Sequence, residues 1–326
     1  MKRYGRWLLG GLLLILVIEI VIVAPEAVNE DQSGVEGEEV ESTGPNDLVQ
    51  QAMQGVHLIE TSEGQKEWEL WADEALAFKS EQQWTLENVK AIFTGKDGVY
   101  FTVTGREGFV EPETKNMKVK GNVITRSSNG YVFKTETVNY TSLSRLLESP
   151  GEVEVIGPRD VNGNSLRLAG KGMTADLLES VMDIHENVKA TKAVKANQIA
   201  RIRSQRARMS GKKSSASFHG NVIIDMDDMR ITGPDAEFIY DKSNSVIESM
   251  YVKNGVRVSD ALKYATSDNV KVLFDEEKFV FRGAPRVVQN NDELTGEQIV
   301  FLDGGDRVKV QKVRARVEED SMKESK

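Results

Sequence analysis

The side chains that most often carry catalytic chemistry are spread along this chain and not grouped. Its three histidines, His57, His185 and His219, are far apart, and none lies at a His-Glu-x-x-His or other close metal-ligand spacing. Cysteine is absent, so the chain has no thiol nucleophile and no disulfide. No Gly-x-Ser-x-Gly elbow occurs. The sequence therefore predicts a protein that is not an enzyme and that uses no metal or cofactor.

Two glycine-containing segments resemble nucleotide motifs only in part. Gly211-Lys212 resembles the end of a phosphate-binding loop, but Arg206 stands where that loop needs Gly, and Lys213 where it needs Ser or Thr. The Ala-Gly-Lys-Gly segment at 169–172 lies between predicted strands and not between a strand and a helix, as a dinucleotide site would. Neither segment predicts nucleotide binding.

An acidic group forms the remaining candidate for a ligand site. Asp225, Asp227 and Asp228 could coordinate a cation through their carboxylates. The same residues are typical of a turn, here between Ile224 and Ile231. The turn is the favoured interpretation.

The overall charge limits the classes of partner. The formal net charge is −9, which argues against broad binding to nucleic acid or anionic membrane. Against this background, 189–213 holds nine basic residues and no acidic one. This stretch could contact phosphorylated lipid headgroups, or it could be a solvated strand and loop that keep a sheet edge soluble. No aromatic residue interleaves its charges, so nucleic acid is not an expected partner.

The N-terminal 25 residues contain an apolar run that predicts a single transmembrane helix. Residues 7–23 are interrupted by one charge, Glu19, and would span roughly 26 Å as a helix. Basic residues precede the run, and none follows until Lys66. The positive-inside rule then predicts a single-pass protein with a cytoplasmic N-terminus and a body outside the cytoplasm.

Two points about this segment stay open. A cleaved signal peptide could end at Ala24, although the following Pro25 disfavours cleavage. Glu19 could contact a partner's transmembrane helices or could reach the outer interface. The next segment, 26–47, carries eight acidic residues and no basic one, which predicts a disordered tether.

Beyond the tether, the sequence alternates between apolar and other residues with period two, as in Val99, Phe101 and Val103. This pattern predicts antiparallel strands with one buried face. Five dipeptides predict tight turns between strands: Asp97-Gly98, Asn129-Gly130, Asn162-Gly163, Asn254-Gly255 and Asp303-Gly304. One short helix is predicted over 47–54, ended by Gly55.

An internal repeat divides this β region into two halves. Gly121-Asn122-Val123-Ile124 is followed by Tyr140 and then by Leu-Leu-Glu-Ser at 146–149. Gly220-Asn221-Val222-Ile223 is followed by Tyr240 and then by Val-Ile-Glu-Ser at 246–249. A weaker copy, Leu-Leu-Glu-Ser, stands at 177–180. Such repeats predict stacked supersecondary units that share a continuous core.

The two halves resemble two families of one pathway. The first half resembles LptC, the bitopic component of the lipopolysaccharide export machine, and the second resembles the soluble LptA or OstA-like bridge. The segments that resemble LptC are Gly64 with 68–72, 98–101, 120–123, 169–176 and 187–190. Those that resemble LptA are 218–222, 237–241, 282–287 and 294–301. Members of these families carry one such body each, so the chain resembles a fusion of the two.

The resemblance implies an all-β fold of two tandem open β-jellyrolls, at 48–192 and 193–317, followed by a charged tail at 318–326. It further implies that lipopolysaccharide acyl chains lie between the sheets of each jellyroll. The implied partners are lipopolysaccharide, an inner-membrane ABC exporter complex, and a further jellyroll bridge or outer-membrane acceptor at the C-terminal edge.

An apolar groove would stabilise the lipid, because each acyl CH₂ left in water costs about 0.8 kcal/mol. We expect eight aromatic residues to line it: Trp68, Phe101, Phe133, Tyr140, Phe238, Phe274, Phe281 and Phe301. The same residues could instead form a packed core. We expect Val56 and Leu58 at one end, and Val308 and Val310 at the other, to lie on edge strands that pair with partners.

Two other functions fit the pattern less well. A membrane-anchored β-scaffold or adhesion protein would bind protein only, through a solidly packed body. A glycan-cleaving β-helix enzyme would need clustered carboxylates in a groove. A lipid-accessible interior distinguishes the lipopolysaccharide-carrying protein from both of these alternatives.

Overall fold

The computed structural model describes residues 49–316, except 63, 79–81, 96–97, 161, 196–197, 242–245, 291 and 304–306. The predicted anchor at 1–25, tether at 26–47 and tail at 318–326 lie outside the described residues. Among the residues that are described, no helix combines the length and the apolar character needed to cross a membrane.

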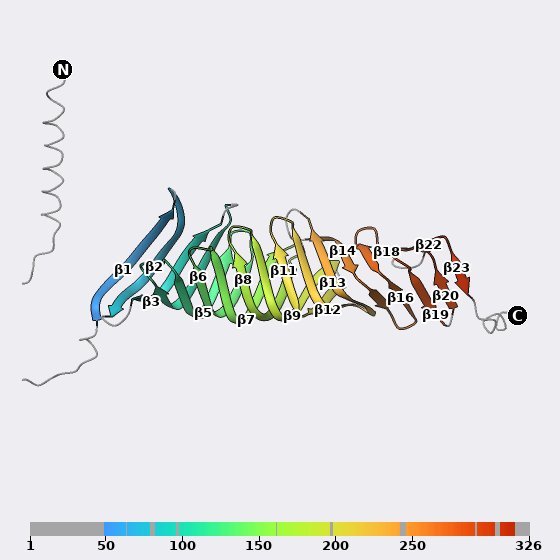
Figure 1. The fold of residues 1–326 in the computed structure, drawn as a ribbon, viewed down its shortest axis with the longest axis horizontal. Coiled ribbons are helices and arrows are strands. Elements are labelled where there is room, and N and C mark those ends of the chain that lie inside the picture. Colours follow the sequence, from blue (N-terminus) through green and yellow to red (C-terminus); the bar gives the residue numbers. More distant parts are fainter. Residues whose placement is uncertain are drawn as a thin grey trace, which may run out of the picture. The chain divides into compact units, whose positions relative to one another are not determined.

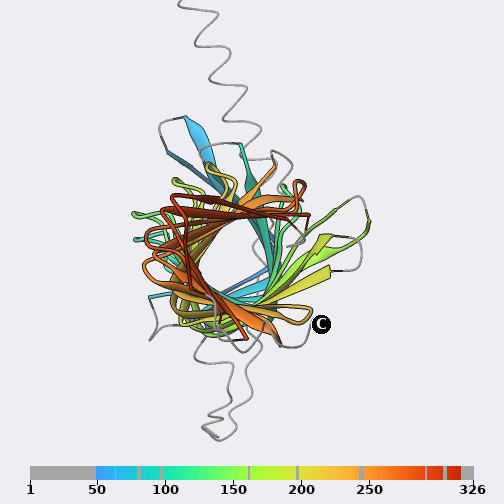
Figure 2. The same ribbon diagram turned by 90° about the vertical axis from the view of Figure 1, so that its right-hand side faces the viewer.

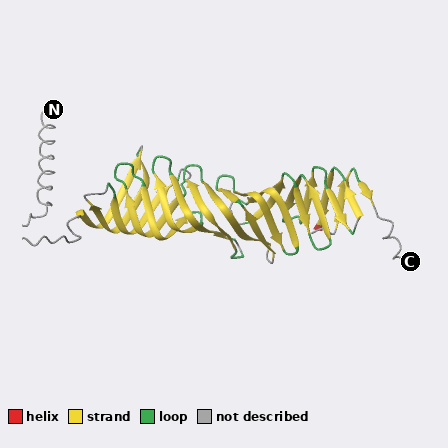
Figure 3. Cartoon of the chain, turned by 60° about the horizontal axis from the view of Figure 1, so that its bottom comes forward, coloured by secondary structure: helices red, strands yellow, loops and turns green. Residues whose placement is uncertain are grey.

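The described body consists of strands and turns (Figures 1 and 3). The short segment drawn as a helix in Figure 3 is a 3₁₀ turn, and the described residues contain no α-helix. The strands are β1 (Val49–Ser62), β2 (Gln65–Phe78), β3 (Trp84–Thr94), β4 (Tyr100–Val110), β5 (Met117–Ser127), β6 (Val132–Thr141), β7 (Leu146–Arg159), β8 (Ser165–Asp176), β9 (Val181–Lys195), β10 (Gln198–Ser204), β11 (Arg206–Ser210), β12 (Ser215–Met226), β13 (Met229–Tyr240), β14 (Ile247–Lys253), β15 (Val256–Ser259), β16 (Lys263–Ser267), β17 (Asn269–Leu273), β18 (Lys278–Arg282), β19 (Arg286–Gln289), β20 (Asp292–Thr295), β21 (Gln298–Leu302), β22 (Arg307–Gln311) and β23 (Arg314–Arg316). The all-β prediction is confirmed for this part of the chain.

Each strand pairs antiparallel with neighbours that are close in sequence, and together they form one 23-stranded sheet. The strands follow one another along the long axis of Figure 1 in chain order. Burial alternates as the period-two pattern predicts, most regularly in β5, where every second side chain from Met117 to Ser127 is buried. One face of the sheet therefore forms a continuous apolar interior.

The strands bend near their middles, and the repeated Gly-Asn pairs lie at two of these bends. Gly121 and Asn122 have φ values of 83° and 51°, and Gly220 and Asn221 have values of 79° and 50°. The β5–β6 and β12–β13 pairings shift register at these pairs. The repeat found in the sequence thus marks a β-bulge that bends the strand, because Gly and Asn tolerate the left-handed region best.

The bends divide the sheet into two limbs. From β10 onward, limb A contains β11, β14, β17, β18, β21 and β22, and limb B contains β10, β15, β16, β19, β20 and β23. The longer strands contribute one half to each limb, so β12 pairs with β11 at one end and with β10 at the other. The strands of both limbs surround a common axis in Figure 2. This arrangement is consistent with an open β-jellyroll.

The interior contains two apolar clusters that meet. The first runs from Val56 to Leu147 and includes Leu177, and the second runs from Phe133 to Phe301. Phe101 and Ala175 pack against both clusters. The clusters therefore divide within β6–β8, whereas the sheet continues without a break from β9 to β10. The domain boundary at 192/193 stays a prediction.

Two local predictions are wrong. Residues 49–54 belong to strand β1 and not to a helix, because Ala52, Val56 and their neighbours pair with β2. Asn254-Gly255 does not close a hairpin: it separates β14 from β15, which both pair with β13, and so it lies at a bend of one interrupted strand. Asn129-Gly130 and Asn162-Gly163 lie between strands that pair directly, as predicted. Asp97 and Gly304, from the other two dipeptides, lie outside the described residues.

Close packing near the bends gives a test of this geometry. A Cβ atom added at Gly170 would lie 2.5 Å from Ile184 Cγ2 and 3.0 Å from the Glu186 carbonyl oxygen. We expect Gly170→Ala to lower the free energy of unfolding by about 1–3 kcal/mol, because the strand must move to admit the methyl group. Gly151→Ala is the matched control, since nothing lies within 4 Å of its added Cβ. Equal denaturation midpoints for the two variants would contradict the bend geometry.

Candidate functional site

A pocket with a mainly apolar lining lies between the tips of the two limbs, here called the mouth pocket. Its volume is about 540 Å³. Limb B contributes Val99, Phe101, Ser127, Asn129, Tyr131, Phe133 and Leu166, and limb A contributes Ala175, Asp176, Ser180, Val181, Met182, Met209, Ser210, Gly211, Lys212, Ser215, Ala216 and Tyr240. The lining is mainly apolar, and the volume is in the range of small-molecule sites, roughly 300–1,000 Å³.

Strand alternation places the apolar part of this lining. Phe133, Leu166 and Met209 are each less than one-tenth exposed and face inward from their strands. The two methionines, Met182 and Met209, are flexible side chains that adapt to irregular ligands. A site lined in this way can hold hydrocarbon without a fixed shape.

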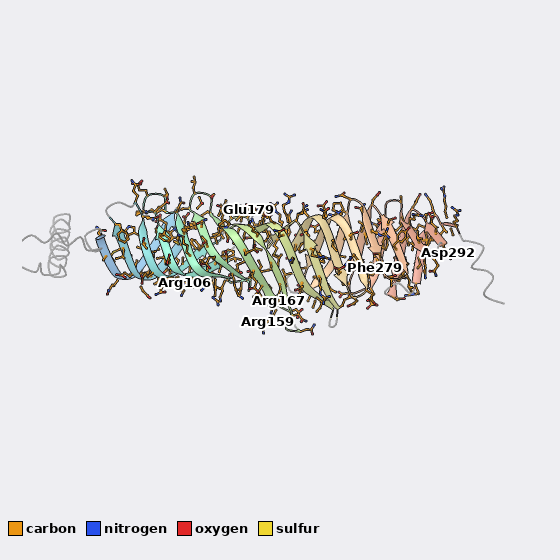
Figure 4. The ribbon with its side chains drawn as sticks, turned by 90° about the horizontal axis from the view of Figure 1, so that it is seen from below. Arg106, Arg159, Arg167, Glu179, Phe279 and Asp292 are labelled. Atoms are coloured by element: carbon orange, nitrogen blue, oxygen red, sulfur yellow. The ribbon has the colours of Figure 1, made fainter. Side chains whose placement is uncertain are left out.

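The turns supply the polar rim. Lys212 donates to Glu179 Oε2 at 3.1 Å and to the Leu178 carbonyl at 3.2 Å. Glu179 is labelled in Figure 4 on limb A, and Arg159 on limb B. The Lys212–Glu179 pair is exposed, so it is worth less than about 1 kcal/mol and can exchange with another charged group.

Two tyrosines introduce hydroxyl groups into the mouth pocket without charge. Burial raises the pKa of the Tyr131 phenol, and burial together with the nearby Tyr131 raises the pKa of Tyr240. Both phenols are therefore neutral near pH 7. Tyr131 also stacks on Phe133, with ring centroids 6.3 Å apart. The pocket thus offers hydroxyl groups within an apolar wall.

A second, smaller space of about 80 Å³ lies further along the body, here called the far pocket. Phe281 and Phe301 line it and contact each other edge to face, with centroids 5.6 Å apart. Phe279, labelled in Figure 4, also lines it. Lys263 Nζ lies 5.7 Å from the centroid of the Phe301 ring, so a limb B side chain reaches a limb A aromatic here.

The eight predicted groove residues fall into three groups. Phe101 and Phe133 line the mouth pocket. Phe281 and Phe301 line the far pocket. Trp68, Tyr140, Phe238 and Phe274 are at most 5% exposed and belong to the apolar clusters without lining either pocket. Their role in lipid binding stays a prediction.

Sequence reasoning missed several residues of the mouth pocket. Tyr240 occupies the same place in the repeat as Tyr140, which was a signal that could have found it. Met182 in β9 and Met209 in β11 also line the pocket. The prediction of the groove lining considered only aromatic residues, so it did not include these two methionines. Tyr131 follows the Asn129-Gly130 turn, and a turn residue gives no period-two signal.

The predicted partner edges lie at the two ends of the sheet. Among the described strands, β1 pairs only with β2, and β22 pairs only with β21. The Val56 side chain is buried, Leu58 and Val310 are half-buried, and Val308 is 45% exposed. One side of each strand therefore retains free backbone donors and acceptors that could pair with another chain.

Asp225, one of the three carboxylates considered as a cation site, pairs with arginine side chains. Asp225 accepts from Arg230 Nε at 2.6 Å and from Arg203 at 3.1 Å, and Arg230 is the main cause of its lowered pKa. Within the described ranges, no group of three His, Asp or Glu side chains could hold a metal ion. Asp225 therefore lies near the end of β12 in surface ion pairs, and Asp227 and Asp228 form the turn to β13, which was the favoured interpretation.

The basic stretch at 189–213 forms the end of β9, then β10, β11 and the following turn. Arg203, Arg208 and Lys212 pair with carboxylates at the surface. Lys192 is different, since its side chain is 2% exposed and its Nζ lies 3.3 Å from Asp160 Oδ2. The stretch therefore contributes strands and local ion pairs, and headgroup binding by it stays a hypothesis.

An antiparallel sheet bent into two limbs, with apolar space between their tips, defines a jellyroll-like β protein with an internal apolar groove. The chain belongs to the LptC-related lipopolysaccharide-assembly family, whose model matches residues 13–193. Residues 201–303 match the LptA/(LptD N-terminal domain) lipopolysaccharide transport protein family. The fusion of an LptC-like and an LptA-like part, expected from the sequence, is thereby confirmed.

The similarity to a single solved structure is low. The chain is similar to the crystal structure of LptH, the LptA homologous periplasmic component of the lipopolysaccharide transport device from Pseudomonas aeruginosa. The two are 14% identical with a TM-score of 0.35, over 39% of this chain and 99% of that one. No curated relative matches the chain.

Proposed function

We propose that this chain is a periplasmic bridge, anchored in the inner membrane, that accepts lipopolysaccharide from an ABC exporter and passes it toward the outer membrane. The observation that carries the proposal is the mouth pocket, an apolar space of about 540 Å³ between the limb tips. Membership of a lipopolysaccharide-assembly family supports the identity of the lipid.

The mechanism needs binding and no covalent step. Acyl chains move from water into the interior, where each buried CH₂ contributes about 0.8 kcal/mol. The glycan and phosphates stay at the rim, near Lys212 and the serines of the turns. Neutral Tyr131 and Tyr240 can donate to lipid oxygens without placing a charge beside hydrocarbon.

Transport along the body requires successive sites. The mouth pocket and the far pocket lie on the same inner face of one continuous sheet, so a lipid can pass between them without leaving the apolar interior. The energy must come from another protein, since the sequence has no nucleotide-binding motif. The ABC exporter is the proposed source.

The two free edges are the proposed docking positions. We assign β1, with Val56 and Leu58, to the exporter side, because it is the first strand after the predicted anchor and tether in the sequence. We assign β22, with Val308 and Val310, to the next jellyroll or an outer-membrane acceptor. Addition of a partner strand at either edge would continue the antiparallel sheet.

The direct test is equilibrium binding of lipopolysaccharide, fluorescently labelled on its glycan, to the purified full chain in detergent. We expect saturable binding that an unlabelled lipopolysaccharide displaces and that the delipidated glycan alone does not. Displacement by the glycan, or absence of saturable binding by a folded protein, would reject the lipid-bridge function and favour a protein-binding scaffold.

A further inference from the structure

Two ion pairs join the tips of the limbs in this section: Lys115 with Glu60, whose charged atoms lie 3.6 Å apart, and the more buried pair of Arg145 with Glu67. Arg145 lies in the limb A turn between β6 and β7, and its Nη1 donates to Glu67 Oε1 of limb B at 2.9 Å. Its Nη2 donates to the backbone carbonyl of Thr94, where β3 ends. The pair is largely buried, with side-chain exposures of 16% for Arg145 and 15% for Glu67. A single guanidinium therefore holds two limb B strands against limb A.

The backbones of the two tips are also close at this point. Within limb A, the Arg145 carbonyl accepts from the Leu177 amide at 3.2 Å, and Leu177 in turn faces Gly95 of limb B. A Cβ atom added at Gly95 would lie 2.9 Å from the Leu177 carbonyl oxygen, so only glycine allows this approach. Arg145 itself has a φ of 56°, a conformation that is unfavourable for Arg. The turn thus keeps a strained backbone where its side chain crosses to limb B.

Beneath this contact lie buried polar atoms without partners. Trp68 Nε1 and Arg145 Nε have no hydrogen-bond partner among the described residues, and Tyr140 Oη makes no hydrogen bond of good geometry. Burial raises the pKa of the Tyr140 phenol, and the nearby Ser142 side chain offsets only part of this. Phe93 connects Trp68 with Tyr140: it pairs across the strands with Trp68, and its ring centroid lies 4.4 Å from that of Tyr140. Buried donors normally find acceptors, and an unmade bond costs about 1–3 kcal/mol. Their position suits a ligand that brings acceptor oxygens.

This section of the interior is closed, whereas the neighbouring section is open. Trp68, Phe93 and Tyr140 are at most 3% exposed. Neither the mouth pocket nor the far pocket reaches them. The closed section is also the one next to β1, the first strand after the predicted anchor and tether in the sequence.

We propose that Arg145 is a latch that closes the first section of the groove, and that its release opens a receiving site beneath it. The ligand class is an acyl-chain amphiphile with ester, amide or hydroxyl oxygens near the start of its chains, which Trp68 and Tyr140 would bind. This inference rests on the proposed function and adds to it a gated first site.

The test uses the absence of native cysteine. In the full chain, Glu67→Cys with Arg145→Cys places the only two thiols on opposite limbs, at the contact that Arg145 and Glu67 make. A short bismaleimide can then cross-link the two limbs there and hold the first section closed. Glu67→Cys with Thr94→Cys is the matched control, because both positions lie on limb B and their cross-link does not join the two limbs. A photoreactive residue at Phe93 reports on lipopolysaccharide beneath the latch, and one at Phe133 reports on the mouth pocket.

We expect Arg145→Gly to raise the lipid adduct at Phe93 about tenfold, a change in open population equivalent to ~1.4 kcal/mol. Gly adopts a φ of 56° without strain, so this variant should fold at least as well as the parent. Locking the Glu67→Cys/Arg145→Cys protein should remove the Phe93 adduct and keep the Phe133 adduct. Cross-linking the control pair should change neither.

The outcomes separate the claim that Arg145 is a latch from the claim that the chain is a lipid bridge. Equal adducts at Phe93 in the open and locked proteins, with the Phe133 adduct present, would overturn the latch and keep the proposed function. Loss of the Phe133 adduct from every folded variant would overturn the proposed function and the latch with it. In the Arg145→Gly protein, Tyr140→Phe should lower the Phe93 adduct, and an unchanged yield would reject the receiving role of the phenol.

Discussion

Asp160→Asn is expected to lower the free energy of unfolding by about 3 kcal/mol, because it leaves the Lys192 ammonium buried without a counter-charge. The Lys192 side chain is 2% exposed and that of Asp160 is 8% exposed. Asp160 also accepts from the amides of Asn162 and Asn164, both at 2.9 Å, and so orders the β7–β8 turn. Chemical denaturation of the full chain at pH 7 measures the effect.

The same carboxylate predicts a dependence on pH. Burial alone would raise the pKa of Asp160, but the Asn164 amide and the Lys192 ammonium lower it below its usual value. A lowered folded-state pKa contributes stability that is present above the unfolded pKa, near 3.9, and is lost as the pH falls through the folded value. The stabilities of the parent and Asp160→Asn should therefore converge below about pH 4.

An exposed pair serves as the control for this prediction. Lys134 donates to Glu154 at 3.0 Å, and the two side chains are 48% and 44% exposed. Glu154→Gln should change stability by less than about 0.5 kcal/mol. If Asp160→Asn were as mild as Glu154→Gln, Lys192 would have to reach solvent, and the buried pair would be wrong.

Met209→Glu is expected to weaken lipopolysaccharide binding roughly a hundredfold, or about 3 kcal/mol, because a carboxylate would replace a thioether in contact with hydrocarbon. Met209 lines the mouth pocket and is 8% exposed. The pocket is wide enough to hydrate the new carboxylate when lipid is absent, so the fold should persist. The labelled-lipid binding assay with the purified full chain measures the change.

Ile199→Glu provides the comparison for Met209→Glu. Ile199 is 44% exposed on β10, lies outside both pockets, and undergoes the same change from apolar to acidic. It should bind lipid like the parent. If both variants lost affinity equally, the added negative charge would explain the loss, and the mouth pocket would have no special role.

Strand identity was predictable because burial follows the period of the backbone. In β5 the alternation from Met117 to Ser127 is nearly perfect, and the sequence carries it directly. The predicted helix at 47–54 failed because its residues have weak periodicity, so pairing with β2 decided the structure. Asn254-Gly255 failed for a related reason: the dipeptide permits positive φ at a bend as readily as in a hairpin.

The site was less predictable than the fold, because it joins residues that no local pattern connects. Glu67 and Arg145 are 78 positions apart, and they meet only because the limbs bend toward each other. The mouth pocket likewise combines Phe101 with Tyr240. Alternation shows that both face inward, but strand tilt and register decide which inward residues share a space.

The period-two pattern also could not separate a lining residue from a packed one. Phe238 and Phe133 both occupy buried positions between less buried neighbours. Yet Phe238 contacts Phe218 edge to face in the interior, and Phe133 lines the mouth pocket. The difference depends on how closely the limbs approach at each position. Such long-range geometry is absent from the spacing of residues along one strand.

The most direct test of the central claim is photo-crosslinking in cells that contain an active exporter, with the photoreactive residue at Phe133 and, separately, at Phe281. These positions sample the mouth pocket and the far pocket. A two-part lipid bridge predicts a lipopolysaccharide adduct at both positions that depends on ATP. Absence of a lipid adduct at both positions, in a protein that is folded and anchored, would contradict the lipid-bridge account.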